Sequence, residues 1–153
     1  MSSYIDPASS AKVIEIIPML NMPAGTLSPS YSAPDFTYAV DVRLFTRALI
    51  VFVINGLGTG ATLDLTLKQA AGDAFSAWST STQTDGSAAV VPQFTPSNDN
   101  AIYTVSVDCS KTQNALGVEA VVTSTGATRA RFGAYAILFP YDTTNATSPD
   151  MEI

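Results

Sequence analysis

Side chains that enzymes use for catalysis are scarce in this sequence. It contains no histidine and a single cysteine, Cys109, so it lacks the Ser-His-Asp and Cys-His arrangements, the commonest general base and the usual zinc ligands. Ser9 and Lys12 have the spacing of the S-x-x-K motif, but the S-D-N and K-T-G motifs of penicillin-binding enzymes are missing. Most hydrolase chemistry is thereby excluded, and we expect no catalytic residue, no cofactor and no metal site.

A glycine-rich segment at residues 56–61 formally matches G-x-G-x-x-A, the fingerprint of dinucleotide-binding folds. That motif needs a following helix, whose N-terminal amide groups hold the pyrophosphate. Here Leu63, Leu65 and Leu67 follow at every second position, which predicts a strand. We therefore expect a hairpin loop that binds no nucleotide.

Thirteen acidic residues would suffice for the carboxylate pair of a glycosidase. Their spacing marks no pair, because Asp41, Asp64, Asp108 and Glu119 fall on outward strand positions or at strand ends. The polar cluster at residues 97–100 offers oxygen ligands for calcium, but no second acidic segment accompanies it. A capped turn is the simpler interpretation of that cluster.

Aromatic side chains support two interpretations. One is a platform on which sugar rings stack, made by Trp78 with Tyr31, Tyr38, Tyr103, Tyr135 and Tyr141. The other is packing, with Trp78 and Tyr103 in the core and the remaining tyrosines at subunit contacts, where a ring with a polar tip is favoured. Packing is the interpretation that we prefer.

The composition points to a protein that is partly covered by neighbours. Hydrophobic residues make up 46% of the 153 residues and charged residues 13%, against about 25% charged in ordinary soluble domains. The net charge of −6 repels phosphate backbones, so nucleic acid is not an expected partner. The apolar run at residues 48–54 is far shorter than the ~20 residues of a membrane helix. The N-terminus lacks the features of a secretory signal, which favours a cytoplasmic start.

Hydrophobic periodicity predicts an all-β fold. Alternation is clear at Leu63, Leu65 and Leu67, whereas residues 47–54 are apolar without alternation, which indicates cover on both faces or a neighbouring subunit. We expect an antiparallel two-sheet sandwich, jelly-roll-like, over residues 35–141. The expected strands are residues 36–43, 47–54, 63–69, 75–81, 102–108, 118–124 and 129–139.

The first 34 residues hold five of the nine prolines and are expected to form an extended N-terminal arm with one strand. That strand spans residues 12–17, is stopped by Pro18, and is expected to join a sheet edge of its own or a neighbouring subunit. Residues 142–153 are expected to form a C-terminal tail. The candidate interface residues are Val13, Ile14, Ile16 and Ile17 in the arm, and Arg129, Arg131 and Tyr135 in the last strand.

Several segments, taken in order, resemble small virion structural proteins of tailed bacteriophages, of the head-decoration or capsid-cement type. They are residues 51–60, 63–69, 75–78, 99–108 and 118–123, and the resemblance covers residues 35–141. The sequence departs from the pattern at residues 112–115, where Thr-Gln-Asn-Ala stands in place of aromatic and basic residues.

The resemblance implies a non-enzymatic protein that stabilises a capsid by burying surface across capsomer boundaries. Its implied partner is a major capsid protein, and its implied location is the capsid surface of a virion assembled in the host cytoplasm. The apolar patch expected at residues 49–53 and 135–139 predicts a homo-oligomer, a trimer or a dimer. The alternative function is a glycan- or receptor-binding module of a phage tail or fibre.

Overall fold

The structure is a computed structural model that describes residues 11–71, 74–83 and 85–140. The described residues form eleven β-strands and contain no helix, as the periodicity predicted. The predicted C-terminal tail lies outside them. The strands are β1 (Lys12–Met22), β2 (Gly25–Leu27), β3 (Ser30–Ser32), β4 (Asp35–Thr37), β5 (Ala39–Asp41), β6 (Phe45–Leu57), β7 (Thr62–Ala70), β8 (Trp78–Thr80), β9 (Ala101–Asp108), β10 (Ala115–Thr123) and β11 (Ala130–Pro140).

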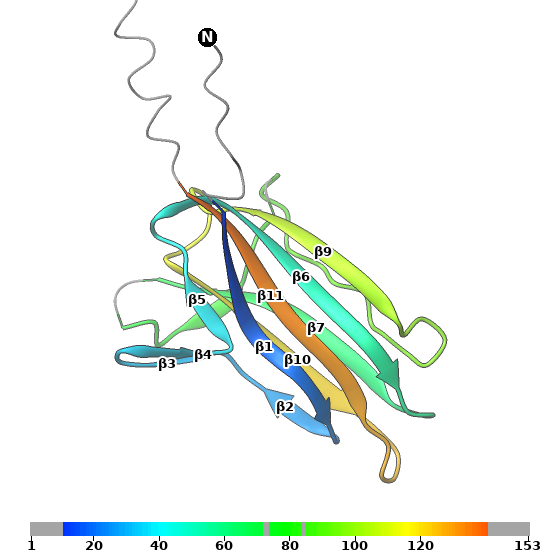
Figure 1. The fold of residues 1–153 in the computed structure, drawn as a ribbon. Coiled ribbons are helices and arrows are strands. Elements are labelled where there is room, and N and C mark those ends of the chain that lie inside the picture. Colours follow the sequence, from blue (N-terminus) through cyan, green and yellow to red (C-terminus); the bar gives the residue numbers. More distant parts are fainter. Residues whose placement is uncertain (1–10, 72–73, 84, 141–153) are drawn as a thin grey trace, which may run out of the picture.

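Two antiparallel sheets pack face to face, which confirms the predicted sandwich (Figure 1). Sheet A has the order β1-β11-β6-β9, and sheet B the order β2-β10-β7-β8, with β5 pairing on β10 beside β2. Numbered along the chain, the eight strands of the two main paths follow 1-8-3-6 and 2-7-4-5, the order of a jelly roll. A short hairpin, β3-β4, stands apart from both sheets.

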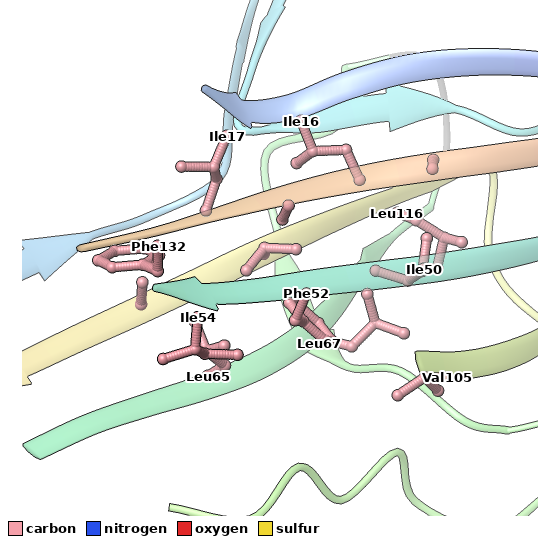
Figure 2. Packing of buried hydrophobic residues seen from close by; sticks show 14 of the residues in the cluster. Ile16, Ile17, Ile50, Phe52, Ile54, Leu65, Leu67, Val105, Leu116 and Phe132 are labelled. Atoms are coloured by element: carbon pink, nitrogen blue, oxygen red, sulfur yellow. The ribbon is translucent and has the colours of Figure 1, made fainter. Parts of the chain in front are cut away.

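The hydrophobic core fills the space between sheets A and B. Figure 2 shows Phe52 of β6 and Leu67 of β7 within it. Burying a side chain of this size stabilises the fold by roughly 1.5 to 3 kcal/mol. Every second residue of the facing strands β6 and β7 is buried: Ala48, Ile50, Phe52, Ile54, Leu63, Leu65 and Leu67.

Two predicted strands are shorter than expected. Residues 36–43 are interrupted at Tyr38, whose φ of 52° breaks the extended backbone and separates β4 from β5. Residues 75–81 form a strand only over Trp78–Thr80. The other five strands of the main body lie within about three residues of their predicted bounds.

The N-terminal segment contains more strand than the sequence suggested. The prediction that Pro18 stops the first strand is wrong, because β1 runs on to Met22 and pairs with β11 of its own sheet. Pro18 is exposed at a bulge, where its missing N–H costs little. The bulge lies over Gly133, where an added Cβ would stand 3.2 Å from the Ile17 carbonyl oxygen.

Candidate protein interface

The outward side of sheet A is apolar. Directly paired residues of antiparallel strands project to the same side of a sheet, so the register assigns each side chain to a face. Val13 and Ile102, at opposite edges, are 66% and 72% exposed, and the side chains between them are partly exposed. We call this surface the A face; its apolar members are Val13, Leu49, Val51, Val53, Ile102, Tyr135 and Ile137, and the register places the polar Thr104 and Ser106 of β9 among them.

The outward side of sheet B is built differently. Lys68 Nζ lies 3.3 Å from Glu119 Oε1, and Gln93 Nε2 donates to Asp64 Oδ1 at 2.9 Å. The Lys68 and Glu119 side chains are 20% and 31% exposed, and polar side chains that pair in this way at a surface need no apolar cover. We call this surface the B face; its members on β7 and β10 are Thr62, Asp64, Thr66, Lys68, Glu119, Val121 and Thr123.

Where sheet B does carry small apolar residues on its outer side, the chain covers them itself. Ala70 and Ala115 pair there and are fully buried. The rings of Tyr31, Phe36 and Phe75 pack over them, with centroids 4.7 to 4.9 Å apart. Among the described residues the A face has no such cover, since in Figure 1 no described segment crosses in front of β11 and β6.

Charged side chains of both signs frame the A face. The register pairs Arg47 with Asp108 at one end, places Arg131 at the other end, and sets Glu15 beside Tyr135. Lys111 adds a further basic group beside Asp108, with its Nζ 3.7 Å from Asp108 Oδ2, so the frame carries charges of both signs.

Three of the predicted interface residues belong to this surface. Val13 and Tyr135 are members of the A face, and Arg131 is exposed at its end. Arg129 lies just before β11, outside the face, and its Nη1 donates to the Asn21 carbonyl oxygen at 3.1 Å. That bond ties the beginning of β11 to the end of β1.

The three predicted isoleucines lie on the other side of β1. Ile16 and Ile17 are 4% and 0% exposed in the core of their own chain (Figure 2), and Ile14 packs partly against it. Their burial is satisfied within the subunit, which leaves them little surface to offer a partner. The β1 bulge places both Ile16 and Ile17 inward, which a regular alternation would not do.

One member of the A face was missed by the sequence reasoning. Every second residue of β9 faces outward, and these residues include Ile102, Thr104 and Ser106. The alternating Val105 and Val107 face inward. This alternation is the signal that would have assigned Ile102 to the outer side.

The glycine-rich segment is followed by strand β7, as expected, but the prediction of a hairpin is wrong: the segment connects β6 of sheet A to β7 of sheet B, and these two strands do not pair. The N–H of Gly58 donates to the Arg129 carbonyl at 2.9 Å, and the N–H of Ala61 donates to the Gly58 carbonyl at 2.9 Å. Gly60 adopts a φ of 79°, in the region that favours glycine. The N–H groups of Gly58 and Ala61 are thus used within the fold, and the described part of the chain contains no helix that could follow this segment.

Several of the acidic residues have structural partners within the fold. Partial burial alone would raise the pKa of Asp41, but its hydrogen bonds to Arg43 and the Arg43 charge outweigh burial and lower it. Hydrogen bonds from Ser110 lower the pKa of Asp108. Within residues 11–71, 74–83 and 85–140, no three His, Cys, Asp or Glu residues stand close enough to hold a metal ion.

The polar cluster at residues 97–100 is a turn closed by its own side chains. Asn98 Oδ1 accepts from the N–H of Thr95 at 2.5 Å, and Asn98 Nδ2 donates to the Gln93 carbonyl at 3.2 Å. This geometry is that of a capped turn.

Trp78 belongs to the aromatic cluster on sheet B, together with Tyr31, Phe36 and Phe75. Beside it lies an open pocket of about 270 Å³, lined by Ala71, Ser76, Ala77, Trp78, Ser79 and Gln113. That volume lies just below the roughly 300 to 1,000 Å³ of most ligand pockets. Tyr103 packs on Phe94 and Tyr135 lies on the A face, so the aromatic side chains do not form one platform.

No helix in the described part of the chain is long and apolar enough to cross a membrane. No family model matches the sequence, and no curated protein matches it.

Solved structures with a related arrangement include coat proteins of infectious bursal disease virus. The VP2 subviral particle matches with a TM-score of 0.48 and 14% identity, over 85% of this chain and 32% of that chain. The T13 viral particle of the same virus matches with a TM-score of 0.48 and 14% identity, over 85% of this chain and 31% of that chain. PirA matches with a TM-score of 0.32 and 12% identity, over 85% of this chain and 84% of that chain. The chain spans about a third of the VP2 length, and at TM-scores below 0.5 these similarities carry no argument about function.

Proposed function

We propose that this chain is a non-enzymatic virion structural protein that decorates and stabilises a bacteriophage capsid through contacts between subunits. The observation that supports this function is the contrast between its two outer faces. The B face is polar, and its apolar end is covered by Tyr31, Phe36 and Phe75. The A face is mostly apolar, and no described segment of the chain covers it. A patch of this kind on a small domain is typical of a protein interaction site.

The physical role follows from the area that such a protein can bury. Each 100 Å² of apolar surface removed from water contributes about 2.5 kcal/mol before the costs of association. One contact of modest size is weak, but copies linked through a lattice bind with an avidity that exceeds any single contact. The major capsid protein is the proposed lattice partner, and the capsid surface the proposed location.

Purified virions test this function directly. Mass spectrometry and gold-labelled antibodies against the chain should find it in many copies on the head, and particles grown without the gene should lose their genome at a lower temperature. Restoring the gene should restore the melting temperature of the particles. Absence of the chain from purified virions, or its detection at the tail alone, would contradict the proposal.

The pocket beside Trp78 favours one other function, a glycan- or receptor-binding module of a phage tail or fibre. An indole ring next to polar groups such as Ser79 and Gln113 is a suitable surface for a sugar ring. Binding of the chain to a glycan array, lost in Trp78→Ala and kept in Tyr135→Ala, would support this alternative.

A further inference from the structure

We propose that the fold makes Asn55 a site of spontaneous covalent modification, at which the side-chain amide is converted to a carboxylate by deamidation. The reaction needs no partner protein and no reactant other than water, so it is independent of the proposed function. Its site is defined by the residue that follows Asn55 and by a break in the strand pairing around it.

Deamidation begins when the backbone nitrogen of the following residue attacks the side-chain carbonyl carbon of an asparagine. The new nitrogen–carbon bond closes a five-membered succinimide ring. The bond between that carbon and the amide nitrogen breaks, and the amide group leaves as ammonia with the proton of the backbone nitrogen. Water then opens the ring at either of its two carbonyl groups, which gives aspartate or isoaspartate.

Asn55 is the one asparagine of the sequence that a glycine follows. Glycine has no Cβ, so its backbone nitrogen is the least hindered nucleophile that a residue in this position can offer. The fold also leaves space around Gly56. Beyond its two chain neighbours, a Cβ built there would meet no atom closer than Asp99 Oδ2, at 3.9 Å. The attacking nitrogen is therefore open to the side chain of Asn55.

The strand pairing is irregular at this point. The register of β6 against β11 shifts here, so that Asn55 and Gly56 together stand opposite Arg131. On the other side of β6, the pairing with β9 ends at Ile54. Ring closure has to turn the asparagine out of the extended backbone, and a bulge that is paired on one side only resists this less than a regular ladder does.

The side chain of Asn55 is free to react. It is exposed, and within the part of the chain that the structure describes no hydrogen bond holds it. By contrast, the side chain of Asn98 makes hydrogen bonds of 2.5 and 3.2 Å. Asn21 is exposed too, but Arg129 Nη1 donates to its carbonyl oxygen at 3.1 Å and so holds the peptide group that would have to rotate.

The products would change the end of the β6-β9 pair. Both carry a carboxylate at position 55, and isoaspartate also adds one atom to the backbone of β6. That atom displaces Leu57, whose N–H donates to Asp99 Oδ2 at 2.7 Å. Hydrogen exchange of the Leu57 amide should therefore be faster in the isoaspartate form. It should change little in Asn55→Asp, which carries the charge without the added atom.

Peptide mass spectrometry of the full chain, aged in neutral buffer, tests the proposal. Electron-transfer dissociation separates aspartate from isoaspartate. Asn55 should deamidate at least about ten-fold faster than Asn21, which corresponds to about 1.4 kcal/mol in activation free energy. Asn55→Gln should abolish the fast reaction, because glutamine would have to close a six-membered ring. Circular dichroism checks that each variant is folded.

Met22→Gly is the matched control, because it places a glycine after Asn21, where β1 pairs regularly with β11. In the folded variant Asn21 should still react more slowly than Asn55, and in urea the two should react at similar rates. An Asn55 amide that outlasts that of Asn21 in the wild type, or equal rates at the two sites in folded Met22→Gly, would overturn the proposal. Neither result affects the search for the chain in virions.

Discussion

Asp99 Oδ2 accepts a hydrogen bond from the backbone N–H of Leu57 at 2.7 Å, across 42 residues of sequence. Leu57 is the last residue of β6, and Asp99 precedes β9, so the bond closes the end of the β6-β9 pair. The bond is partly buried and its acceptor is a carboxylate, and both properties strengthen a hydrogen bond. The carboxylate therefore has a structural role in this turn.

We expect Asp99→Ala to lower the free energy of unfolding by about 1 to 3 kcal/mol, since it leaves the Leu57 N–H without its acceptor. Asp99→Asn keeps an acceptor oxygen at the same place and should cost less. Urea denaturation of the three proteins measures the difference. Equal stability of Asp99→Ala and wild type would mean that water replaces the carboxylate at no cost.

The Asp41–Arg43 pair predicts a dependence of stability on pH. The folded-state pKa of Asp41 is lowered from its ordinary value of 3.8. A lowered pKa contributes stability above 3.8, and that contribution is lost as the pH falls through the folded-state pKa. Unfolding free energies of the wild type and Asp41→Asn should therefore differ more at about pH 7 than at about pH 2. A constant difference across this range would contradict the assignment.

Cys109 is expected to be a slow nucleophile. Burial, with a smaller contribution from the Asp108 charge, raises the pKa of its thiol to about 11. Thiolate is the reactive form, so little of it is present at about pH 8. Alkylation by iodoacetamide should be slow in the folded protein and fast in urea, and Asp108→Asn should accelerate it only slightly. A large acceleration in that variant would assign the shift mainly to charge.

The sequence predicted the sandwich because its longest strands carry strong patterns. Leu63, Leu65 and Leu67 alternate with polar residues, and the structure buries all three while their neighbours face outward. The apolar stretch of β6 was also informative, since Leu49 and Val51 on its outer side are partly exposed and no other described segment covers them. Hydrophobic periodicity in a sequence follows from which side chains are buried, so these features of the two strands could be predicted from the sequence alone.

Local irregularities were not accessible in the same way. Pro18 predicts the end of a strand, yet β1 absorbs it in a bulge beside Gly133, which only the pairing with β11 reveals. The turn at Tyr38 depends on a positive φ that its residue type does not predict. The A face itself required the register of β1, β11, β6 and β9, because a face is defined by strands far apart in the sequence.

Gly117 tests how the aromatic cluster is held on sheet B. It lies on β10, on the outer side, and an added Cβ would stand 2.4 Å from Pro29 Cβ and 2.9 Å from Trp78 Cζ3. Pro29 is buried at this contact. The close approach of the β2-β3 connection to the sheet therefore depends on the missing side chain at position 117.

Gly117→Ala should lower the free energy of unfolding by about 1 to 3 kcal/mol, because the new methyl group forces Pro29 away from the sheet. Combining it with Pro29→Gly removes the atom that clashes, so the double variant should be more stable than the sum of the two single effects predicts, by about 0.5 kcal/mol or more. Val121→Ala, on the same strand and the same side, serves as the control and should cost less. Urea denaturation measures all four variants, and Trp78 fluorescence reports whether the cluster has opened. Strict additivity of the two substitutions would show that Pro29 and Gly117 do not interact in the way the structure indicates.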